Sequence, residues 1–398
     1  MTDTLRPRDQ KDVEAAVQWA LAEGKTLEVV GQGSKRRIGR AAQWDMSLDL
    51  SGLSGVTLYE PEELILSAKA GTPLCDIEAL LAQHNQELAF EPMDYGPVFG
   101  APSGRGTIGG TLAVNVSGPR RIKAGAARDH FLGVTAVSGR GETFKSGGRV
   151  VKNVTGYDLC KVLAGSYGTL AVMTDVTVKV LPRAETEQTL LVLGLDDAAA
   201  CRAMSAAMNS ANDVSGAAHL PAPLAATIQA EAGTAVTALR LEGVAPSVEH
   251  RRAALEVLLK PFGALIAWGE KDSRALWASL RTVMPFANDD RALWRISTAP
   301  ARGAQVAAAI GEGEHFYDWS GGLIWAALPA TGDAGAARVR GALDGEGHAT
   351  LVRAPAAIRA AVPVFEPQAP GLAALTRRLK ESFDPNGVLS PGRMVAGV

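Results

Sequence analysis

Hydrophobic and polar positions in the N-terminal part of the chain switch between helical and strand periodicity. From Asp9 to Glu23 apolar residues recur every three or four positions, which predicts a helix ended by Gly24. Thr72 as a cap and Pro73 at the first turn predict a second helix through about Gln83. Short runs rich in β-branched residues predict strands at Thr26 to Val30, Met46 to Leu50, Val56 to Tyr59 and Leu64 to Ala70, and a hairpin at Phe131 to Lys145.

After Pro182 alanine-rich helical segments alternate with short strands, a pattern typical of an α+β domain with its own sheet. The predicted helices are Asp196 to Met208, Ser247 to Leu259, Asp272 to Val283 and Ala334 to Leu343. The predicted strands are Thr189 to Leu193, Ala238 to Glu242, Leu265 to Trp268, Leu293 to Ser297, Phe316 to Leu328 and His348 to Val352. A last helix, Leu372 to Phe383, precedes a turn at Asp384 to Gly387 that should return the chain to the first domain.

The segment from Gly147 to Pro182 carries the most particular pattern. Thr155 and Asp158 form a capping-box spacing, which predicts a short helix that starts near Gly156. Two glycines, Gly165 and Gly168, should end that helix and lead into a strand from about Thr169 to Leu181. A glycine turn that enters a strand allows the backbone to approach a flat polar ligand closely.

Composition limits the class of protein. The 398 residues suffice for two domains, and a net charge of −2 gives no electrostatic case for nucleic acid. No apolar run reaches the length of a membrane helix, and the charged N-terminus lacks a signal-peptide core. We therefore expect a cytoplasmic protein that reaches the inner face of the cell membrane only peripherally, through partners.

Cysteine and histidine spacing argues against a metal centre. Cys75, Cys160 and Cys201 are far apart, and no two of the six histidines lie three or four residues apart. Neither an iron–sulfur cluster nor a dedicated metal site is indicated. Any redox chemistry should depend on an organic cofactor.

Two further glycine blocks read VVGQGSKRRIGR from Val29 and GTIGGTLAVNVSGPRR from Gly106. Arg36 stands where a Rossmann fingerprint needs its third glycine, and no P-loop sequence is present. With the 147–182 segment, these blocks resemble the flavin-binding domain of the vanillyl-alcohol oxidase and p-cresol methylhydroxylase superfamily. The resemblance is to its 2-hydroxy-acid dehydrogenase branch, and nearly the whole chain is similar to the FAD-binding subunits of bacterial glycolate oxidases.

The resemblance implies an α+β fold in three parts. Residues 1–183 would form a two-subdomain p-cresol methylhydroxylase-type FAD-binding domain, and residues 184–364 an α+β cap domain. Residues 365–398 would be a C-terminal segment that returns to the flavin domain. The cofactor implied is FAD, held noncovalently because neither glycine block contains His or Cys.

The resemblance also implies which residues contact FAD. They are Gly31, Gln32, Gly33, Ser34, Lys35, Thr107, Gly109, Gly110, Asn115, Ser117, Gly118, Asp129, Gly168 and Val172. We expect the backbone N–H groups of Gly33 to Lys35, and those of Gly109 and Gly110, to neutralise the diphosphate. One or two of the glycines should serve only close packing.

Several charged or aromatic positions leave two interpretations open. Lys35 and Arg36 either add charge to the diphosphate site or form a solvated loop face. Arg120 and Arg121 are either a phosphate or partner contact or a surface pair. We favour structural roles for Tyr157, as a core aromatic residue, and for Asp158, as a helix cap. Ser390 stands in the closing turn where the family often has Asn, and its contact with the flavin stays open.

Oxidation of a 2-hydroxy acid needs a cation for the carboxylate and a base for the hydroxyl proton. Related catalytic subunits carry a His-x-Gly-Asp-Gly-Asn-x-His motif, whereas this chain has only the single His348 in GHAT. Arg295 and His348 are the catalytic candidates, although a lone residue of either type in a strand is commonly structural. Three further cap-domain residues are candidates for the substrate site, with packing in the protein core as the competing explanation: Trp319, Trp325 and Arg353.

Three functional hypotheses follow. The preferred one is an FAD-binding subunit of a multisubunit glycolate oxidase, with a homologous catalytic FAD subunit and an iron–sulfur subunit as partners. The substrate class would be small 2-hydroxy acids, with glyoxylate as the product of glycolate. The alternatives are a self-sufficient FAD-dependent 2-hydroxy-acid dehydrogenase and a non-catalytic scaffold. The missing second histidine favours the first hypothesis over the second, and the intact glycine loops oppose the third.

Overall fold

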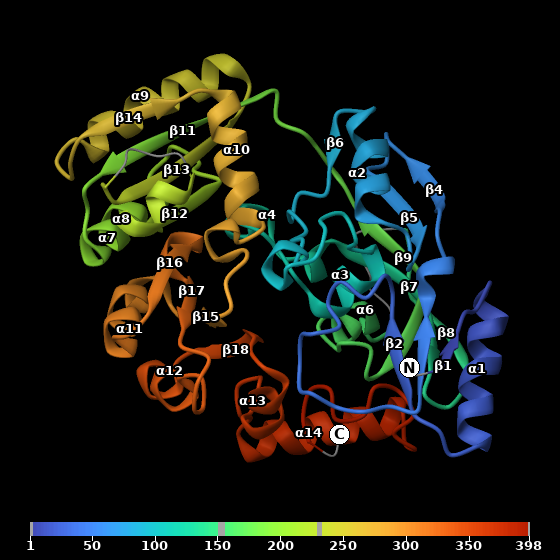
Figure 1. Ribbon diagram of the computed structural model, residues 1–398. Helices are drawn as coiled ribbons and strands as arrows, with labels where there is room; N and C mark the ends of the chain where they lie inside the picture. The colour runs from blue at the N-terminus through green and yellow to red at the C-terminus, as the bar shows by residue number, and fades with distance from the viewer. Residues whose placement is uncertain (1–2, 150–155, 229–232, 397–398) are drawn as a thin grey trace.

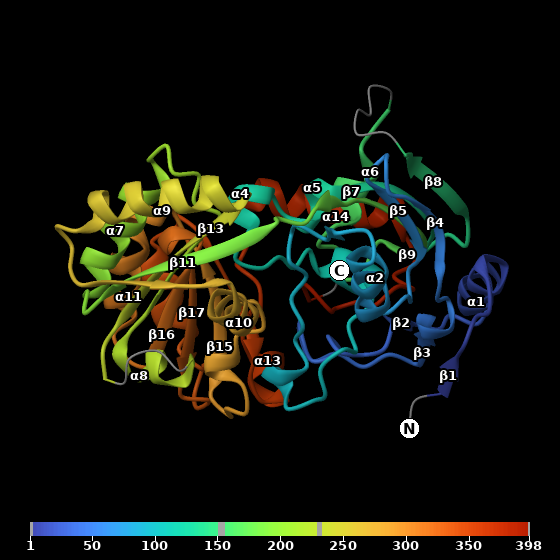
Figure 2. The same cartoon turned by 90° about the horizontal axis from the view of Figure 1, so that it is seen from above.

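The computed structural model describes residues 3–149, 156–228 and 233–396. Figure 1 shows two lobes side by side: residues up to about 182, drawn blue to green, and the segment that follows, drawn from light green through yellow to orange. The last helix, α14 (Pro370–Phe383), crosses back to lie along the first lobe. Figure 2, seen from above, shows the same separation into two sheet-containing halves.

The first lobe contains a small parallel sheet and a larger antiparallel sheet. β2 (Leu27–Val30) and β1 (Asp3–Leu5) flank β3 (Met46–Asp49) in parallel. The five-stranded sheet has the order β4-β5-β9-β7-β8, with bounds Val56–Glu60, Ile65–Lys69, Ala171–Lys179, Phe131–Ser138 and Thr143–Gly147. The short strands β6 and β10 are Gln86–Glu87 and Leu181–Pro182. The helices are α1 Gln10–Ala22, α2 Leu74–Ala82, α3 Ile108–Val114, α4 Arg121–Ala124, α5 Ala127–His130 and α6 Leu159–Leu163, with 3-10 turns at Leu50–Gly52 and Pro97–Phe99.

The second lobe is built on one eight-stranded antiparallel sheet. Its order is β14-β11-β13-β12-β16-β17-β15-β18, with bounds Leu265–Trp268, Thr186–Leu193, Val236–Gly243, Gly216–Leu220, Glu314–Asp318, Leu323–Leu328, Ala292–Ser297 and His348–Arg353. Its helices are α7 Asp197–Met208, α8 Ala222–Ala225, α9 Ala245–Leu259, α10 Glu270–Arg281, α11 Gly303–Ile310, α12 Ala336–Leu343 and α13 Ala356–Ala361. 3-10 turns lie at Ala226–Ile228, Met284–Phe286, Pro300–Arg302 and Trp319–Gly321. The predicted class, α+β, is confirmed.

Three sequence predictions of local structure were wrong. α6 begins at Leu159 because Asp158 itself caps it by accepting the Lys161 N–H; the proposed partner Thr155 lies outside the described residues. Thr72 does not cap α2, since its hydroxyl donates to the Lys69 carbonyl at 2.7 Å. The predicted strand at Phe316 to Leu328 is a hairpin of two strands, β16 and β17, joined by the turn at Trp319–Gly321.

The C-terminal segment is tied to the first lobe through Asp384. Its carboxylate accepts the N–H groups of Val388 and Leu389, and the buried Lys380 ammonium donates to it at 2.6 Å. The Val388 carbonyl in turn accepts the Leu27 N–H. The closing turn is thereby fixed against β2, directly before the first glycine loop.

A buried charge network joins the two lobes. Glu91 of the first lobe accepts from Arg240 of β13 at 2.8 Å and from the Arg120 N–H at 2.6 Å. Arg120 also donates to Glu242 at 2.7 Å. Burial alone would raise the pKa of Glu91, but the charges of Arg240 and Arg120 prevail and lower it to about 2. Neither interpretation offered for Arg120 holds, because this side chain is buried in the interface between the lobes.

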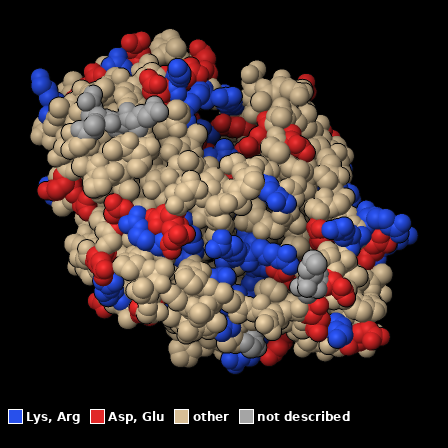
Figure 3. Space-filling model, in the orientation of Figure 1, with Lys and Arg blue, Asp and Glu red and all other residues tan. Residues whose placement is uncertain are grey.

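The charge network borders a cleft of about 880 Å³ lined by Glu78, Glu87, Arg120, Arg183 and Arg240, among others. Figure 3 shows a hollow between the upper parts of the two lobes in which acidic and basic side chains meet. Ion pairs thus join the lobes at this cleft, beside a buried apolar cluster to which Met93 and Tyr95 of the first lobe and Trp277 of the second belong.

Replacing Glu91 with Gln should lower the free energy of unfolding by about 3 kcal/mol, since it leaves two buried guanidinium groups short of a counter-charge. Thermal unfolding would measure the loss. Glu256→Gln is the matched control, because Glu256 pairs with Arg252 on the surface of α9 and should change stability by no more than about 1 kcal/mol. Equal effects of the two substitutions would contradict the interface network.

Candidate functional site

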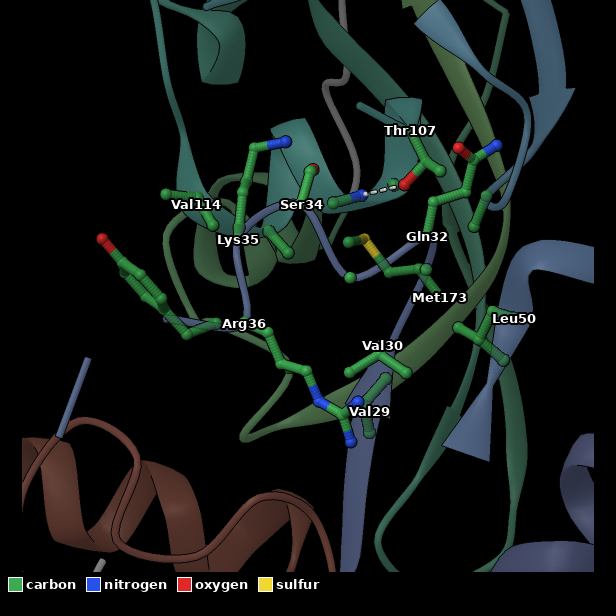
Figure 4. A pocket seen from close by; sticks show the side chains of 18 of the residues that line it. Val29, Val30, Gln32, Ser34, Lys35, Arg36, Leu50, Thr107, Val114 and Met173 are labelled. Carbon is green, nitrogen blue, oxygen red and sulfur yellow. Dashed lines mark hydrogen bonds between the residues drawn. The ribbon is translucent and has the colours of Figure 1, made fainter. Parts of the chain in front are cut away.

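A cavity of about 680 Å³ lies where β2, α3 and the start of β9 meet. Figure 4 shows its walls, with Gln32, Ser34 and Lys35 on the loop after β2 and Thr107 close to Gln32. The predicted contacts that line it are Gly31, Gln32, Gly33, Ser34, Lys35, Thr107, Gly109, Gly110 and Gly168.

The first glycine loop presents free backbone donors to this cavity. Gly33 has a φ of +76°, a left-handed conformation that strains residues with a side chain. The N–H groups of Gly33, Ser34 and Lys35 have no acceptor within residues 3–149, 156–228 and 233–396. Three adjacent free donors form a concave site for an anion, as expected from the sequence.

The second glycine block contributes differently from the prediction. The Gly109 N–H donates to the Ala70 carbonyl at 2.8 Å, and the Gly110 N–H donates to the Thr107 hydroxyl at 3.2 Å. Both donors are therefore occupied by the protein and are not free for a diphosphate. A Cβ on Gly31 would lie 2.6 Å from the Thr107 hydroxyl, and one on Gly109 2.7 Å from Ala70. These two glycines permit close packing of the cavity wall.

Lys35 and Arg36 have separate roles. The Lys35 side chain is buried and lines the cavity, and its ammonium has no hydrogen-bond partner in the described part of the chain. Burial lowers its pKa to about 8, which the charge of Asp94 only partly offsets. Arg36 instead pairs with Glu28, and Figure 4 shows its side chain directed away from that of Lys35.

Arg393, which the sequence analysis did not single out, lines the same cavity. Its guanidinium is buried, and the Nε and Nη1 atoms lack hydrogen-bond partners among the described residues, while Nη2 donates to the Lys35 carbonyl at 3.2 Å. Its Nη1 lies 3.9 Å from a Glu28 carboxylate oxygen, which balances part of the charge, but the two buried nitrogens without hydrogen-bond partners favour a ligand that supplies an acceptor. Because Arg393 lies in the C-terminal turn, far along the chain from the glycine loops, no sequence motif linked it to this cavity.

A second cavity of about 400 Å³ adjoins the first. Val114 and Tyr167 line both, and Asn115, Ser117 and Arg295 line the second. Tyr167 has a φ of 55°, a strained conformation for a residue with a side chain. Because it stands at the variable position of Gly-Ser-x-Gly, no motif pointed to it.

The remaining predicted contacts, Gly118, Asp129 and Val172, line neither cavity. Val172 packs in the core, since alternate residues of β9 face opposite sides and its neighbours Ala171 and Met173 face the cavity. The Asp129 carboxylate accepts the Ala126 N–H. A Cβ on Gly118 would lie 2.8 Å from Glu91, so this glycine permits close packing.

The remaining residues that the sequence singled out lie in structural or surface positions. The Ser390 hydroxyl accepts the Val29 N–H, and Arg353 donates to the carbonyls of Val98 and Phe286. The structure confirms Asp158 as a helix cap, but Tyr157 is 90 % exposed, so its predicted core position was wrong. His348 is exposed at the edge of the sheet.

Comparison with known proteins decides the family. Residues 4–147 match the FAD binding domain family. The chain is 32% identical over 381 residues to glycolate oxidase subunit GlcE of Escherichia coli (strain K12), covering 96% of this chain and 95% of that protein. The chain belongs to the GlcE family.

Two further comparisons agree with this membership. A segment of 118 residues is 37% identical to glycolate oxidase subunit GlcD of Bacillus subtilis (strain 168), covering 30% of this chain and 24% of that protein. The fold is that of p-cresol methylhydroxylase, with a TM-score of 0.76 at 14% identity over 99% of this chain and 88% of that one. This GlcE-family chain is thus an oxidoreductase of the FAD-dependent, glycolate oxidase type.

The residues present fit FAD, the cofactor of this family member. The free N–H groups of Gly33 to Lys35, the unpaired Lys35 ammonium and the two unpaired nitrogens of Arg393 supply donors and positive charge for a diphosphate. The cavity walls around Ala113, Ala171 and Met173 supply apolar contact for flat rings. These donors and charges are in place in the protein without a ligand.

FAD affinity should fall as the pH rises above about 8. The free protein loses the Lys35 proton near that pH, whereas a bound diphosphate would retain it. Binding then takes up a proton, so the Kd should increase by up to tenfold per pH unit above about 8 and stay flat below it. Fluorescence titration of FAD from pH 6.5 to 9.5 measures this, with Lys35→Met as the comparison. A wild-type profile that is as flat as that of Lys35→Met would refute the assignment.

Replacing Arg393 with Met should raise the Kd for FAD about ten- to a hundredfold, because it removes charge-assisted donors. Arg40→Met is the matched control, since Arg40 contacts the same segment through the Gly392 carbonyl but lies outside the cavity. Calorimetry on the two folded variants gives the comparison. Equal affinities would show that Arg393 does not face the cofactor.

Proposed function

We propose that this chain is the FAD-binding subunit of a multisubunit oxidase that converts glycolate, or a similar 2-hydroxy acid, to glyoxylate or the corresponding 2-oxo acid. The observation that carries the proposal is the similarity to GlcE over nearly its full length, combined with a cavity whose free donors suit FAD. The weaker similarity to GlcD supports a homologous catalytic flavoprotein as one partner.

The proposed cofactor contacts are the cavity residues and the adjoining Asn115 and Ser117. The Asn115 side-chain oxygen accepts the Arg128 N–H, and the Ser117 hydroxyl accepts the Ala127 N–H. These bonds fix the loop after α3 at the junction of the two cavities. FAD, when bound, supplies a ring that accepts the two electrons removed from the substrate carbon. Noncovalent binding is proposed because, among the residues that the structure describes, no His or Cys lines either cavity.

Arg295 and His348 are the proposed catalytic residues. Arg295 lines the second cavity from β15, where its guanidinium can hold a carboxylate. Desolvation, with the nearby charges of Arg295 and Arg121, lowers the pKa of His348. His348 lines neither cavity, so this role requires the substrate hydroxyl to extend from Arg295 to the edge of the sheet, where a ring nitrogen could accept its proton.

The electrons would leave through an iron–sulfur partner subunit. With three widely spaced cysteines in 398 residues, this chain cannot supply the ligand set of a four-cysteine cluster. No helix among the described residues is long and apolar enough to cross a membrane. Delivery of electrons to a membrane acceptor would therefore pass through the partners, with this subunit in the cytoplasm.

The test compares the isolated chain with the co-expressed complex in glycolate-dependent dye reduction. We expect the isolated, FAD-loaded chain to show no turnover, and the complex to be active. Within the complex, Arg295→Met and His348→Asn should each lower turnover by about a hundredfold. Arg338→Gln, which breaks a surface pair with Glu312 in the same lobe, should leave it unchanged.

Two outcomes would reject the proposal. Robust turnover by the chain alone would identify a self-sufficient 2-hydroxy-acid dehydrogenase. The chain would be identified as a scaffold by two results together: the purified chain is folded but carries no FAD, and deletion of this subunit dissociates the complex.

A further inference from the structure

A groove of about 850 Å³ lies along the C-terminal segment of the chain. Its walls are residues 360–368, Ala373 of α14, residues 394–396 and Arg40, and all of them are apolar except Arg40, Glu366 and Gln368. Val395 in the groove is 40 % exposed, and α14 exposes Leu372 and Leu375 one turn apart. Exposed apolar surface of this extent is typical of a site that another protein covers.

The groove is preformed, because its floor is bonded to the edge of the second-lobe sheet. The Leu351 N–H of β18 donates to the Val364 carbonyl at 2.8 Å, and the Ala349 N–H donates to the Glu366 carboxylate at 3.0 Å. Arg340 donates to the Phe365 carbonyl at 3.4 Å. A partner that binds here would therefore not have to order the segment first.

A single layer of side chains separates this groove from the cofactor cavity. Phe365 lines the groove, and its ring centroid lies 4.9 Å from that of Tyr167, which lines both the cofactor cavity and the second cavity. The next contact comes from two consecutive residues of the closing turn. Arg393 lines the cofactor cavity, whereas Met394 lines the groove.

The groove and its borders carry positive charge. Arg40 lines it, Arg359 precedes the lining residue Ala360, and Arg377 lies one turn after Ala373 on the same face of α14. Four arginines of these segments form no ion pair in the described part of the chain: Arg40, Arg359, Arg377 and Arg378. The acids of the same segments are Glu366 and Glu381, so a partner with an acidic border would complement the groove.

We propose that this groove is the docking site of the electron-accepting partner, an iron–sulfur protein that presents an apolar segment with an acidic border. Electron transfer slows steeply with distance, and no thicker wall than the pair Tyr167 and Phe365 stands between the cavity and the groove. Two electrons would cross one at a time, each reducing one oxidised iron–sulfur centre, and the two protons would go to solvent. The inference rests on the proposed function for the kind of partner and adds the face on which it binds.

The first test uses the purified, co-expressed complex. A photoreactive benzoylphenylalanine replaces Val395 or, as the matched control, Val56, which is 36 % exposed on β4 and distant from the groove in the sequence. Mass spectrometry after illumination identifies the crosslinked subunit. We expect position 395 to crosslink to the iron–sulfur subunit and position 56 not to do so.

The second test measures the Kd for loss of the iron–sulfur subunit by mass photometry of the diluted complex. Val395→Glu should raise this Kd at least about tenfold, because it buries an unpaired carboxylate in an apolar contact. Arg377→Glu should also raise the Kd and weaken its dependence on salt. Val56→Glu should leave the Kd unchanged, and none of the three residues lines the cofactor cavity, so FAD affinity should not change.

The outcomes separate this inference from the proposed function. A wild-type complex that contains no iron would reject the iron–sulfur partner of the proposed function, and this occupant with it. An iron-containing complex in which position 395 crosslinks to the homologous flavoprotein, to a second copy of this chain or to nothing would overturn the docking site alone. Equal Kd values for Val395→Glu and Val56→Glu would overturn it as well.

Discussion

The cofactor cavity depends on the attachment of the C-terminal turn to β2. Asp384 is almost fully buried and accepts from Lys380, Val388 and Leu389 at once. Its carboxylate packs so closely on Gly139, in the turn between β7 and β8, that a Cβ there would lie 2.2 Å from Asp384 Oδ1. The last segment is thus held against both sheets of the first lobe, and its position carries Arg393 into the cavity.

The sequence predicted those features of the structure that depend on residues close together along the chain. Helix α1, Gln10–Ala22, lies within the predicted range of Asp9 to Glu23, and the loop after β2 presents the donors that its glycines suggested. The sequence could not show that the Gly109 N–H is already bonded, because its acceptor, Ala70, belongs to a distant turn. The bond from the Gly110 N–H to Thr107 is a local helix cap that the prediction missed. Nor could it place Arg393 and Tyr167, which reach the cavity only through tertiary packing.

Tertiary packing also explains why the adjacent residues Arg120 and Arg121 have different contacts. Adjacent positions in the sequence point in different directions at a helix start, so Arg120 enters the buried network with Glu91 and Glu242. Arg121 instead stacks on Trp319 from the other lobe. One dipeptide therefore makes two different contacts between the lobes, a buried ion-pair network and a cation–π contact. The domain boundaries predicted from the sequence stay predictions, although the two large sheets lie on either side of residue 183.

The central claim is that FAD binds in the cavity between β2, α3 and β9, with its diphosphate on the first glycine loop. A crystal structure of the purified chain with FAD tests it most directly. The account predicts diphosphate oxygens within hydrogen-bond distance of the Gly33, Ser34 and Lys35 N–H groups, which are free in this structure. A diphosphate bound instead at Gly109 and Gly110 after rearrangement of α3, or FAD bound elsewhere in the chain, would contradict the account.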